Sequence, residues 1–497
     1  MAEPQLGVIA AGHELTAHVG AEVLRAGGNA VDTAVAAVLA SFVCEPLLTG
    51  LAAGGYLLFV APAEPPVLLD FFVEAPGRGA DPARRAELIP ITVSFGDAVQ
   101  VFNIGPASVG TYGTPRGVYE AARRFGRMPL ADLVGPAATL AREGVVVNAE
   151  QGYLFEILTD IILSTPECAA LFAPNGAPAR MGDVIRQPEL AESLERLGTE
   201  GPEPFYQGDI ATAIVEWVSD RGGMLTTDDL DAYAVIDREP IVVRYRDRDV
   251  LTNPPPSAGG ILIARALAAL EAAPGPPELE RLVEVMDQIQ EERTPEFLSG
   301  LDDPEFVRRF LSRGPQLGST THIAVLDRDG WACSVTCSIG SSSGVVVPGT
   351  GIHLNNMLGE QDLNPLGFHR HPPGRRMPSM MAPTVVVRDG VAELVLGSAG
   401  SNRIRSAILQ TIIRVVDDGL RAGEAVVAPR VHFEDGVVYA EPGIDTAALE
   451  AAHRPIARFR DLNLFFGGVQ AVERDATGAF WGGGDPRRGG ASITVTP

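Results

Sequence analysis

The sequence predicts a layered α+β protein, and three observations support this class. The first part of the chain reads mostly as helices, whereas the part from Thr320 onward reads mostly as strands. Several of those strands are long and apolar, so both of their faces need cover from other layers. The chain has 497 residues, of which 46% are hydrophobic and 21% charged, which is the composition of a globular protein with a large core.

The first elements are expected to be two helices and a strand. Residues 14–25 have helical periodicity and end at a Gly-Gly pair, which is a common stop signal. The Ala- and Val-rich run that follows Asn29 is apolar on nearly all sides up to Cys44, so it predicts a buried helix, which Pro46 ends. A glycine-rich stretch then leads into a strand at 56–60.

The middle of the chain is expected to be mainly helical. Residues 115–240 read mostly as helices with turns between them. We expect one strand at 244–252, a rigid proline-rich turn at 253–260 and a helix at 261–271. Residues 273–318 are rich in Pro, Glu and Arg, which predicts a helical hairpin followed by an exposed linker.

The last part of the chain is expected to form a succession of strands. The segments THIAVLD, WACSVTCSIG, GIHLNN, TVVVRDG and VAELVLG alternate with turn signals such as DRDG. A helix is expected at about 402–419, followed by further strands and turns.

Composition excludes several classes of function. The 39 basic residues against 63 acidic ones give a formal charge of −24, and such a surface repels nucleic acid. Every basic residue is arginine, because the sequence contains no lysine. A lysine Schiff base, a pyridoxal-phosphate anchor and a Walker-A lysine are therefore impossible. We expect no cofactor and no metal.

Cysteine content and the N-terminal sequence predict a cytoplasmic protein. Four cysteines do not make a disulfide framework for a chain of this length, and Cys44, Cys333 and Cys337 are expected in the core. The start, MAEPQLG, has no basic region of a secretory signal. The longest apolar stretch is about a dozen residues, short of the roughly 20 that cross a bilayer, so no membrane partner is expected.

Nine short motifs occur in one order along nearly the whole chain. They are AGHELTAHVGAEVLRAGGNAVDTAV (11–35), GTPRGV (113–118), PFYQGDIA (204–211), RGGMLTTDDLDAY (221–233), NPPPSAGGI (253–261), TTHIAVLDRDG (320–330), GIHLNNML (351–358), GSAGSNRI (397–404) and GDPRRGG (484–490). In all nine the chain resembles the γ-glutamyltranspeptidase family of N-terminal-nucleophile hydrolases. The variant segments DFFVEAPG (70–77) and NNMLGE (355–360) resemble an acylase-like branch of that family.

The resemblance implies a four-layer αββα sandwich that is made as a precursor and cuts its own backbone. The cut would fall between Ser319 and Thr320, giving a large chain of residues 1–319 and a small chain of 320–497 that intertwine as one unit. Cleavage gives Thr320 a free α-amine beside its hydroxyl. The hydroxyl can then act as nucleophile and the amine as base, because the pKa of an α-amine is about 8.

The resemblance also assigns the remaining catalytic roles. Ser338 stands where the family has a threonine that supports the nucleophile, and its hydroxyl is retained. Gly400 and Ser401 stand where a Gly-Gly pair donates two backbone N–H groups to the oxyanion. His322 is expected to be structural, because the α-amine makes a histidine base unnecessary.

The chain departs from the family where the substrate binds. In the segment DFFVEAPG, Phe72 takes the place of an arginine that holds the substrate carboxylate. The other differences are at Gly340 for asparagine, Met357 for glutamine, Glu360 for aspartate and Met380 for the second serine of a pair whose first member, Ser379, is kept. These changes argue against free γ-glutamyl substrates, unless Arg78 or Arg370 has replaced the missing arginine.

Three functions remain open at this stage. The first is a hydrolase or acyltransferase that acts through an acyl-threonine on a small, non-standard acyl or amide compound, with water or an amine as acceptor. The second is a biosynthetic enzyme that hydrolyses a C–C bond next to a carbonyl. The third is a binding or scaffold protein that does not cleave itself. The expected partners are the two cleavage fragments as a heterodimer, with further homo-oligomers also open.

Overall fold

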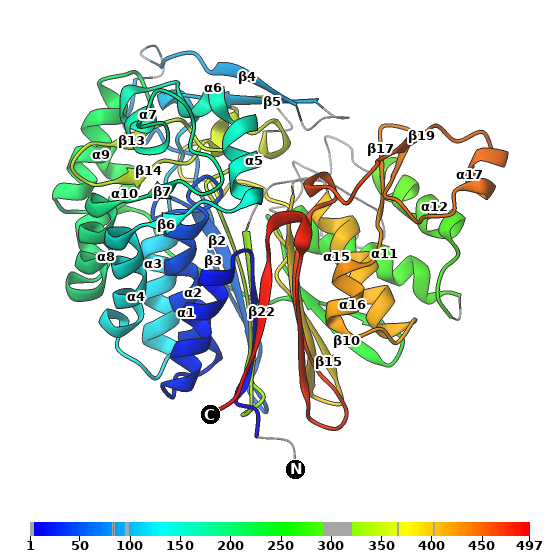
Figure 1. Cartoon of the computed structure of the whole chain (residues 1–497). Coiled ribbons are helices and arrows are strands. Elements are labelled where there is room, and N and C mark those ends of the chain that lie inside the picture. The colour runs from blue at the N-terminus through cyan, green and yellow to red at the C-terminus, as the bar shows by residue number, and fades with distance from the viewer. Residues whose placement is uncertain are drawn as a thin grey trace.

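Two β-sheets packed face to face form the centre of the molecule, with helices covering both outer faces (Figure 1). The computed structural model describes residues 4–81, 83, 85–94, 99–273, 275–291, 321–364, 367–400 and 403–497. This arrangement confirms the predicted αββα sandwich. The two sheets are the layers that position the candidate active site.

The first sheet has seven strands in the order β22-β1-β11-β12-β2-β3-β8, all paired antiparallel. Strands from before and after the predicted cleavage position alternate in it, so neither part of the chain forms the sheet alone. Its strands are β1 (Gly7–Ala11), β2 (Gly54–Val60), β3 (Val67–Phe71), β8 (Ile236–Arg238), β11 (Thr321–Asp327), β12 (Ala332–Ser338) and β22 (Ala491–Val495).

The second sheet has six strands in the order β21-β20-β16-β15-β10-β9 and is also antiparallel. It too takes strands from both parts of the chain. Its strands are β9 (Ile241–Tyr245), β10 (Arg248–Thr252), β15 (Thr384–Arg388), β16 (Val391–Ala399), β20 (Gly468–Arg474) and β21 (Phe480–Gly484).

Helices from the first part of the chain cover the first sheet, and later helices cover the second (Figure 1). The two faces bury separate apolar clusters, and a third apolar cluster fills the space between the sheets. The first layer contains α1 (Glu14–Arg25), α2 (Ala30–Cys44), α3 (Thr114–Phe125), α4 (Leu130–Glu143), α8 (Pro188–Glu200) and α9 (Asp209–Ser219). The second contains α11 (Ala258–Glu271), α12 (Leu279–Glu291), α15 (Arg403–Val416) and α16 (Ala422–Val427).

Shorter elements lie at the ends of the sandwich. They include α5 (Ala149–Ile157), α6 (Thr159–Ile162), α7 (Pro166–Phe172), α10 (Thr227–Asp231), α17 (Ala447–Ala451) and the 3-10 turns η6 (Leu464–Phe466) and η7 (Pro486–Arg488). The small hairpins and sheets are β4 (Ile89–Ser94) with β5 (Val99–Ile104), β6 (Val145–Val146) with β7 (Val184–Ile185), β13 (Val346–Val347) with β14 (Ile352–His353), and β17 (Val431–Glu434), β18 (Val437–Ala440) and β19 (Ile456–Arg458).

The buried helix expected after Asn29 is α2, and every one of its side chains is buried. Its start is fixed by a capping box in which the Asn29 side chain accepts from the backbone N–H groups of Val31 and Asp32, while Asp32 accepts from that of Asn29. Glu45 follows directly as its C-terminal cap residue. The apolar composition fits the position of α2 between the first sheet and the helices α1, α3 and α4. The end of α2 places Glu45 close to the start of β11.

Some expectations about elements were wrong or lie outside the described residues. The single strand expected at 244–252 is a hairpin of β9 and β10, because the chain turns at Arg246, whose φ is 56°. GIHLNN forms only the two-residue strand β14. Within 273–318, the described part contains α12, and the expected linker at 292–318 lies outside the described residues. No helix in the described ranges is long and apolar enough to span a membrane.

Candidate active site

One end of the sandwich brings together the start of β11 and the ends of β1, β12 and β16. Thr321 pairs with Cys337, so Ser338 ends β12 where β11 begins. The ring of His322 lies against Gly397, where a Cβ would meet it at 2.4 Å, so β16 ends near the same place. Gly12, just after β1, would bring a Cβ within 3.1 Å of the Thr321 hydroxyl. Ser319 and Thr320 themselves lie outside the described residues.

Ser338 is fully buried and its hydroxyl is already engaged. Its Oγ accepts a hydrogen bond from the backbone N–H of Gly340 at 2.7 Å. Gly340 has a φ of 71°, and a Cβ there would lie 2.1 Å from Oδ1 of Asn356. The glycine found in place of the family's asparagine is therefore required by this backbone, in a left-handed conformation with no room for a side chain.

Glu360 is buried next to that turn. Its Oε1 accepts from the backbone N–H of Ser341 at 3.0 Å and from the Ser341 hydroxyl at 2.8 Å. A Cβ on Gly340 would lie 2.9 Å from the same oxygen. The structure thus places Glu360 beside Ser338 and Gly340, and the carboxylate fixes the loop that follows β12.

Phe72 is fully buried in the apolar cluster between the two sheets, together with Met357. Its ring stacks on Tyr56, with centroids 5.5 Å apart. Its carbonyl accepts from Arg376, whose own charge is balanced by ion pairs to Asp70 and Glu74 at 3.5 Å. An apolar ring therefore fills this position, and the buried arginine beside it already has carboxylate partners.

The remaining predicted substrate residues are divided between two clusters. Met380 belongs to the apolar cluster that lies under α11, on the far side of the second sheet from Phe72. Ser379 is buried, and its Oγ accepts from the backbone N–H of Met381 at 3.0 Å. The structure therefore does not bring Met380 together with Phe72 and Met357. Its neighbour Met381, which the sequence reasoning did not consider, belongs to the same cluster between the sheets as Phe72 and Met357.

The two arginines considered as replacements are placed elsewhere. Arg78 forms ion pairs with Glu74 and Asp229, both at 3.4 Å. Arg370 is exposed. Neither belongs to the buried cluster around Phe72.

Gly400 directly follows β16 and can only be glycine. Its φ is 119°, and a Cβ would lie 2.6 Å from the Cα of Gly467. Its carbonyl accepts from the backbone N–H of Arg403, the first residue of α15. Ser401, the second predicted oxyanion donor, lies outside the described residues.

His322 is buried between the sheets and neutral. Burial lowers its pKa to about 3. Its Nδ1 is 2.8 Å from the Thr336 hydroxyl, which fixes the ring orientation. A histidine held in this way stabilises the strand pair and has no charged form near neutral pH.

Glu45 is a site residue that the sequence reasoning missed. Its Oε2 accepts from the Thr321 hydroxyl at 2.7 Å, and its Oε1 from the Thr16 hydroxyl at 3.4 Å. Burial raises its pKa to about 7, although the two hydrogen bonds and the charge of Arg488 oppose the shift. The available signal was a lone carboxylate at the end of an apolar helix, directly before the proline that had been interpreted only as a stop.

Comparison with known proteins agrees with this architecture. Residues 16–495 match the family model described as gamma-glutamyltranspeptidase, and the chain belongs to that family of hydrolases and acylases. It is therefore an enzyme of a family whose members are made as autoprocessed precursors.

Individual relatives include both hydrolases and acylases. The chain is 31% identical to the glutathione hydrolase proenzyme of Escherichia coli, over 97% of this chain and 90% of that protein. It is 30% identical to the acylase ACY 1 proenzyme of a Pseudomonas species (strain V22), over 99% of this chain and 94% of that one. Among solved structures, the cephalosporin acylase from Bacillus halodurans superposes with a TM-score of 0.82 at 25% identity, covering 99% of this chain and 96% of that one.

Proposed function

We propose that this enzyme is an autoprocessing threonine hydrolase or acyltransferase whose acyl substrate is not a free γ-glutamyl group. The observation that carries the proposal is the convergence of Thr321, Ser338 and Gly400 at one end of the sandwich. The position that precedes β11 in the sequence is Thr320. Family membership supplies the precursor processing.

The proposed reaction begins after cleavage between Ser319 and Thr320. Oγ of Thr320 attacks the substrate carbonyl carbon, and its proton passes to the new α-amine. Backbone N–H groups of Gly400 and its neighbour Ser401 stabilise the oxyanion. The C–N bond then breaks, and the leaving amine takes the proton, leaving an acyl-threonine ester. Water or an amine attacks the ester, the α-amine accepts the proton, and Oγ takes it back as the product acid or amide departs.

The proposed specificity depends on Phe72. A fully buried aromatic ring cannot provide the bidentate contact that an arginine makes to a carboxylate. Because Arg376 beside it is paired to Asp70 and Glu74, it does not supply that contact either. The enzyme should therefore favour acyl groups without a carboxylate at this place.

Two anilides that differ only in that carboxylate test the specificity. We expect turnover of a 4-aminobutyryl anilide to exceed that of the γ-glutamyl anilide by at least about tenfold in kcat/KM, since a charged hydrogen bond contributes about 1.5–3 kcal/mol. Family-typical turnover of the γ-glutamyl anilide would contradict the proposal. A protein that stays uncleaved and hydrolyses neither anilide would instead favour the binding-protein alternative.

Glu360 gives a graded test in the same region. If its carboxylate holds a substrate amine, Glu360→Gln raises KM for amine-bearing substrates about tenfold and leaves neutral ones unchanged. The glutamine Oε1 can still accept from Ser341, so the loop should keep its conformation. Ser341→Ala is the matched control, because it removes a hydrogen bond to Glu360 without removing its charge. An equal effect of Glu360→Gln on all substrates would make the residue structural.

A further inference from the structure

A cavity of about 340 Å³ lies beside the start of β11, outside the cluster that contains Phe72. Gly12 and Glu45 line its inner end, and both approach the Thr321 hydroxyl. Side chains from α5 and η6 form an apolar part of the wall, represented by Leu154 and Leu464. The volume is that of a small-molecule site, and its location next to the expected nucleophile makes it accessible to a substrate.

Two arginines line this cavity, Arg487 and Arg488, and Arg487 is paired with Glu441 and Asp485. Arg488 differs from Arg487 in its contacts. Within the described residues its guanidinium makes no ion pair, and its buried Nε has no hydrogen-bond partner. A Cβ built on Gly400 would lie 3.4 Å from Nη2, so the guanidinium also borders the proposed oxyanion site. Burial lowers the pKa of Arg488 to about 10, against the attraction of Asp485 and Glu45. A desolvated, unpaired guanidinium is a strong site for an anion.

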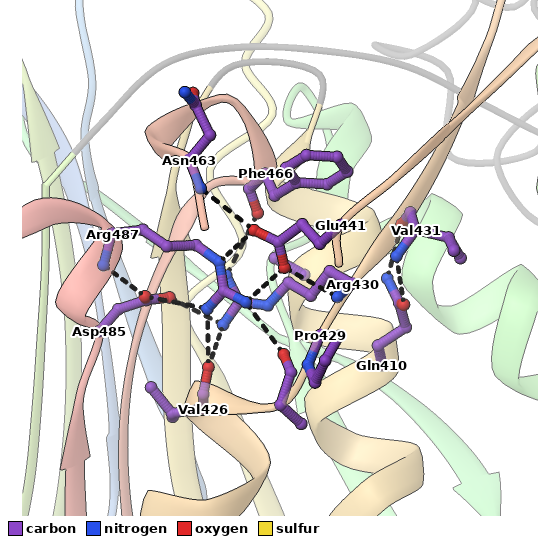
Figure 2. Close-up of polar contacts among 12 residues, drawn as sticks. Gln410, Val426, Pro429, Arg430, Val431, Glu441, Asn463, Phe466, Asp485 and Arg487 are labelled. Carbon is purple, nitrogen blue, oxygen red and sulfur yellow. Dashed lines mark hydrogen bonds and ion pairs between the residues drawn. The ribbon is translucent and has the colours of Figure 1, made fainter. Parts of the chain in front are cut away.

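The two carboxyl groups that attract Arg488 are Asp485 and Glu45, and both have other partners. Glu45 accepts from the hydroxyls of Thr16 and Thr321. Figure 2 shows Asp485 and Glu441 around the guanidinium groups of Arg430 and Arg487. Arg430 pairs with Asp485 at 2.7 Å, and Arg487 pairs with Glu441 through Nε at 2.7 Å. Asp485 also accepts from the backbone N–H of Arg487 at 3.0 Å. This buried network fixes η7 and so holds Arg488 in place. The network uses none of the hydrogen-bond donors of the Arg488 guanidinium.

A second polar group faces the same cavity. His13 lines it, and its Nδ1 accepts from the backbone N–H of Leu15 at 3.1 Å, which leaves the proton of the neutral ring on Nε2. Burial lowers the pKa of His13, so the ring is neutral at working pH. The cavity thus combines the guanidinium of Arg488 and the neutral N–H donor of His13 with apolar side chains. Its lining also includes the carboxyl groups of Glu45 and Glu150 and the polar residues Gln151, Tyr153 and Asn463.

We propose that this cavity is a substrate subsite for a carboxylate carried on an apolar group, with Arg488 as its direct anion contact. The inference rests on the proposed function, because it takes Thr320 as the reacting residue. Such a substrate would place its carboxylate at Arg488 and not at Phe72. The enzyme would then still recognise an anionic compound, but through a different residue from the missing arginine.

Binding of two unreactive probes tests the subsite. 4-Phenylbutyrate and 4-phenylbutanol share their apolar part and differ in charge, and neither contains a bond for the enzyme to cleave. Isothermal titration of the purified protein should show the carboxylate binding at least tenfold more tightly. Arg488→Gln should remove that preference and Arg488→Lys should keep part of it. Arg123→Gln, on the exposed surface of α3, is the matched control and should change nothing.

A second variant tests the subsite without changing Arg488, so the test does not depend on the folding of Arg488→Gln. Leu154→Trp fills the cavity from α5 and leaves every residue of η7 unchanged in sequence. It should abolish binding of both probes while the circular dichroism spectrum is retained. Persistence of the carboxylate preference in either Arg488→Gln or Leu154→Trp would overturn the proposal, as would equal binding of both probes to the wild type. Probe binding is measured without turnover, so it reports on the subsite alone. If the proposed reaction is wrong, the anilide assays will show it, and if the subsite is wrong, the probe titrations will show it.

Discussion

The protonation of Glu45 depends on its burial and its hydrogen bonds, neither of which can be seen in the sequence. Its neighbours are the hydroxyls of Thr16 and Thr321, the guanidinium of Arg488 and, on the opposite wall of the cavity, Glu150. A carboxyl in this environment prefers to be protonated, because its burial has no full counter-charge. Its charge state therefore links the start of β11 to pH.

Glu45→Gln should flatten the pH dependence of stability. The pKa of the folded carboxyl is raised from 4.5 to about 7, so the folded state holds a proton that the unfolded state has lost. The wild type must then lose stability as pH rises from 4.5 to 7, by roughly 3 kcal/mol in all. Glutamine does not titrate, so it removes this dependence. The free energy of unfolding of the variant should therefore increase relative to that of the wild type as pH rises. Urea unfolding at pH 5, 6, 7 and 8 measures it.

The control for that comparison is Glu64→Gln, because Glu64 is exposed. Its stability difference from the wild type should be the same at every pH. A Glu45→Gln difference that is also constant across the series would show that Glu45 is charged throughout, and the inferred environment would be wrong.

Gly400→Ala should destabilise the fold by about 2–4 kcal/mol, because an added Cβ meets the Gly467 backbone in addition to an unfavourable φ. Gly390 has a φ of 79° but open space around its Cβ position, so Gly390→Ala isolates the conformational cost of about 1 kcal/mol. Thermal and urea unfolding of both variants gives the difference. Equal losses of stability would mean that the backbone at Gly400 does not approach the backbone at Gly467 closely.

Among the elements, those with a long periodic or uniformly apolar pattern were predicted well from the sequence. The helix expected at 14–25 is α1, and the apolar run after Asn29 is α2, because a pattern of that length leaves one buried arrangement. The hairpin β9–β10 was missed because its turn is made by Arg246 and Asp247, which carry no glycine or proline signal. Short strands depend on their partners, so local sequence does not define them.

Asn29→Ala should cost more stability than an ordinary cap substitution. Its side chain accepts from two N–H groups of the buried helix α2 and donates to the carbonyl of Phe125 at 2.7 Å, so all three lose a buried partner. We expect a loss of about 2 kcal/mol or more in urea unfolding. Asn148→Ala removes the equivalent capping box from the peripheral helix α5 and should cost about 1 kcal/mol. A smaller loss at Asn29 than at Asn148 would contradict this reading of α2.

At the level of the whole molecule, the chain order predicted the layers, but it could not predict the site completely. Both sheets contain strands from before and after residue 320, and the first sheet interleaves them, so the site residues meet only in the assembled sandwich. Ser338 and Gly400 were found because family motifs mark them. His13 and Arg488 lie within two of the quoted motifs and Glu45 lies outside them, but no role was assigned to any of the three because the sequence does not show that they lie close together. Met380 and its neighbour Met381 precede β15 and belong to different apolar clusters, a difference that the sequence does not record.

The most direct test is the intact mass of the purified wild type, Thr320→Ala and Thr321→Ala. We predict that the wild type consists of two chains, 1–319 and 320–497, because the Thr320 hydroxyl attacks the preceding carbonyl. Thr320→Ala should remain one chain of 52.4 kDa. Thr321→Ala should still be cut, since that hydroxyl is directed at Glu45. An uncut wild type, or a Thr320→Ala protein that still yields a fragment beginning at residue 320, would contradict the assignment of Thr320 as the nucleophile.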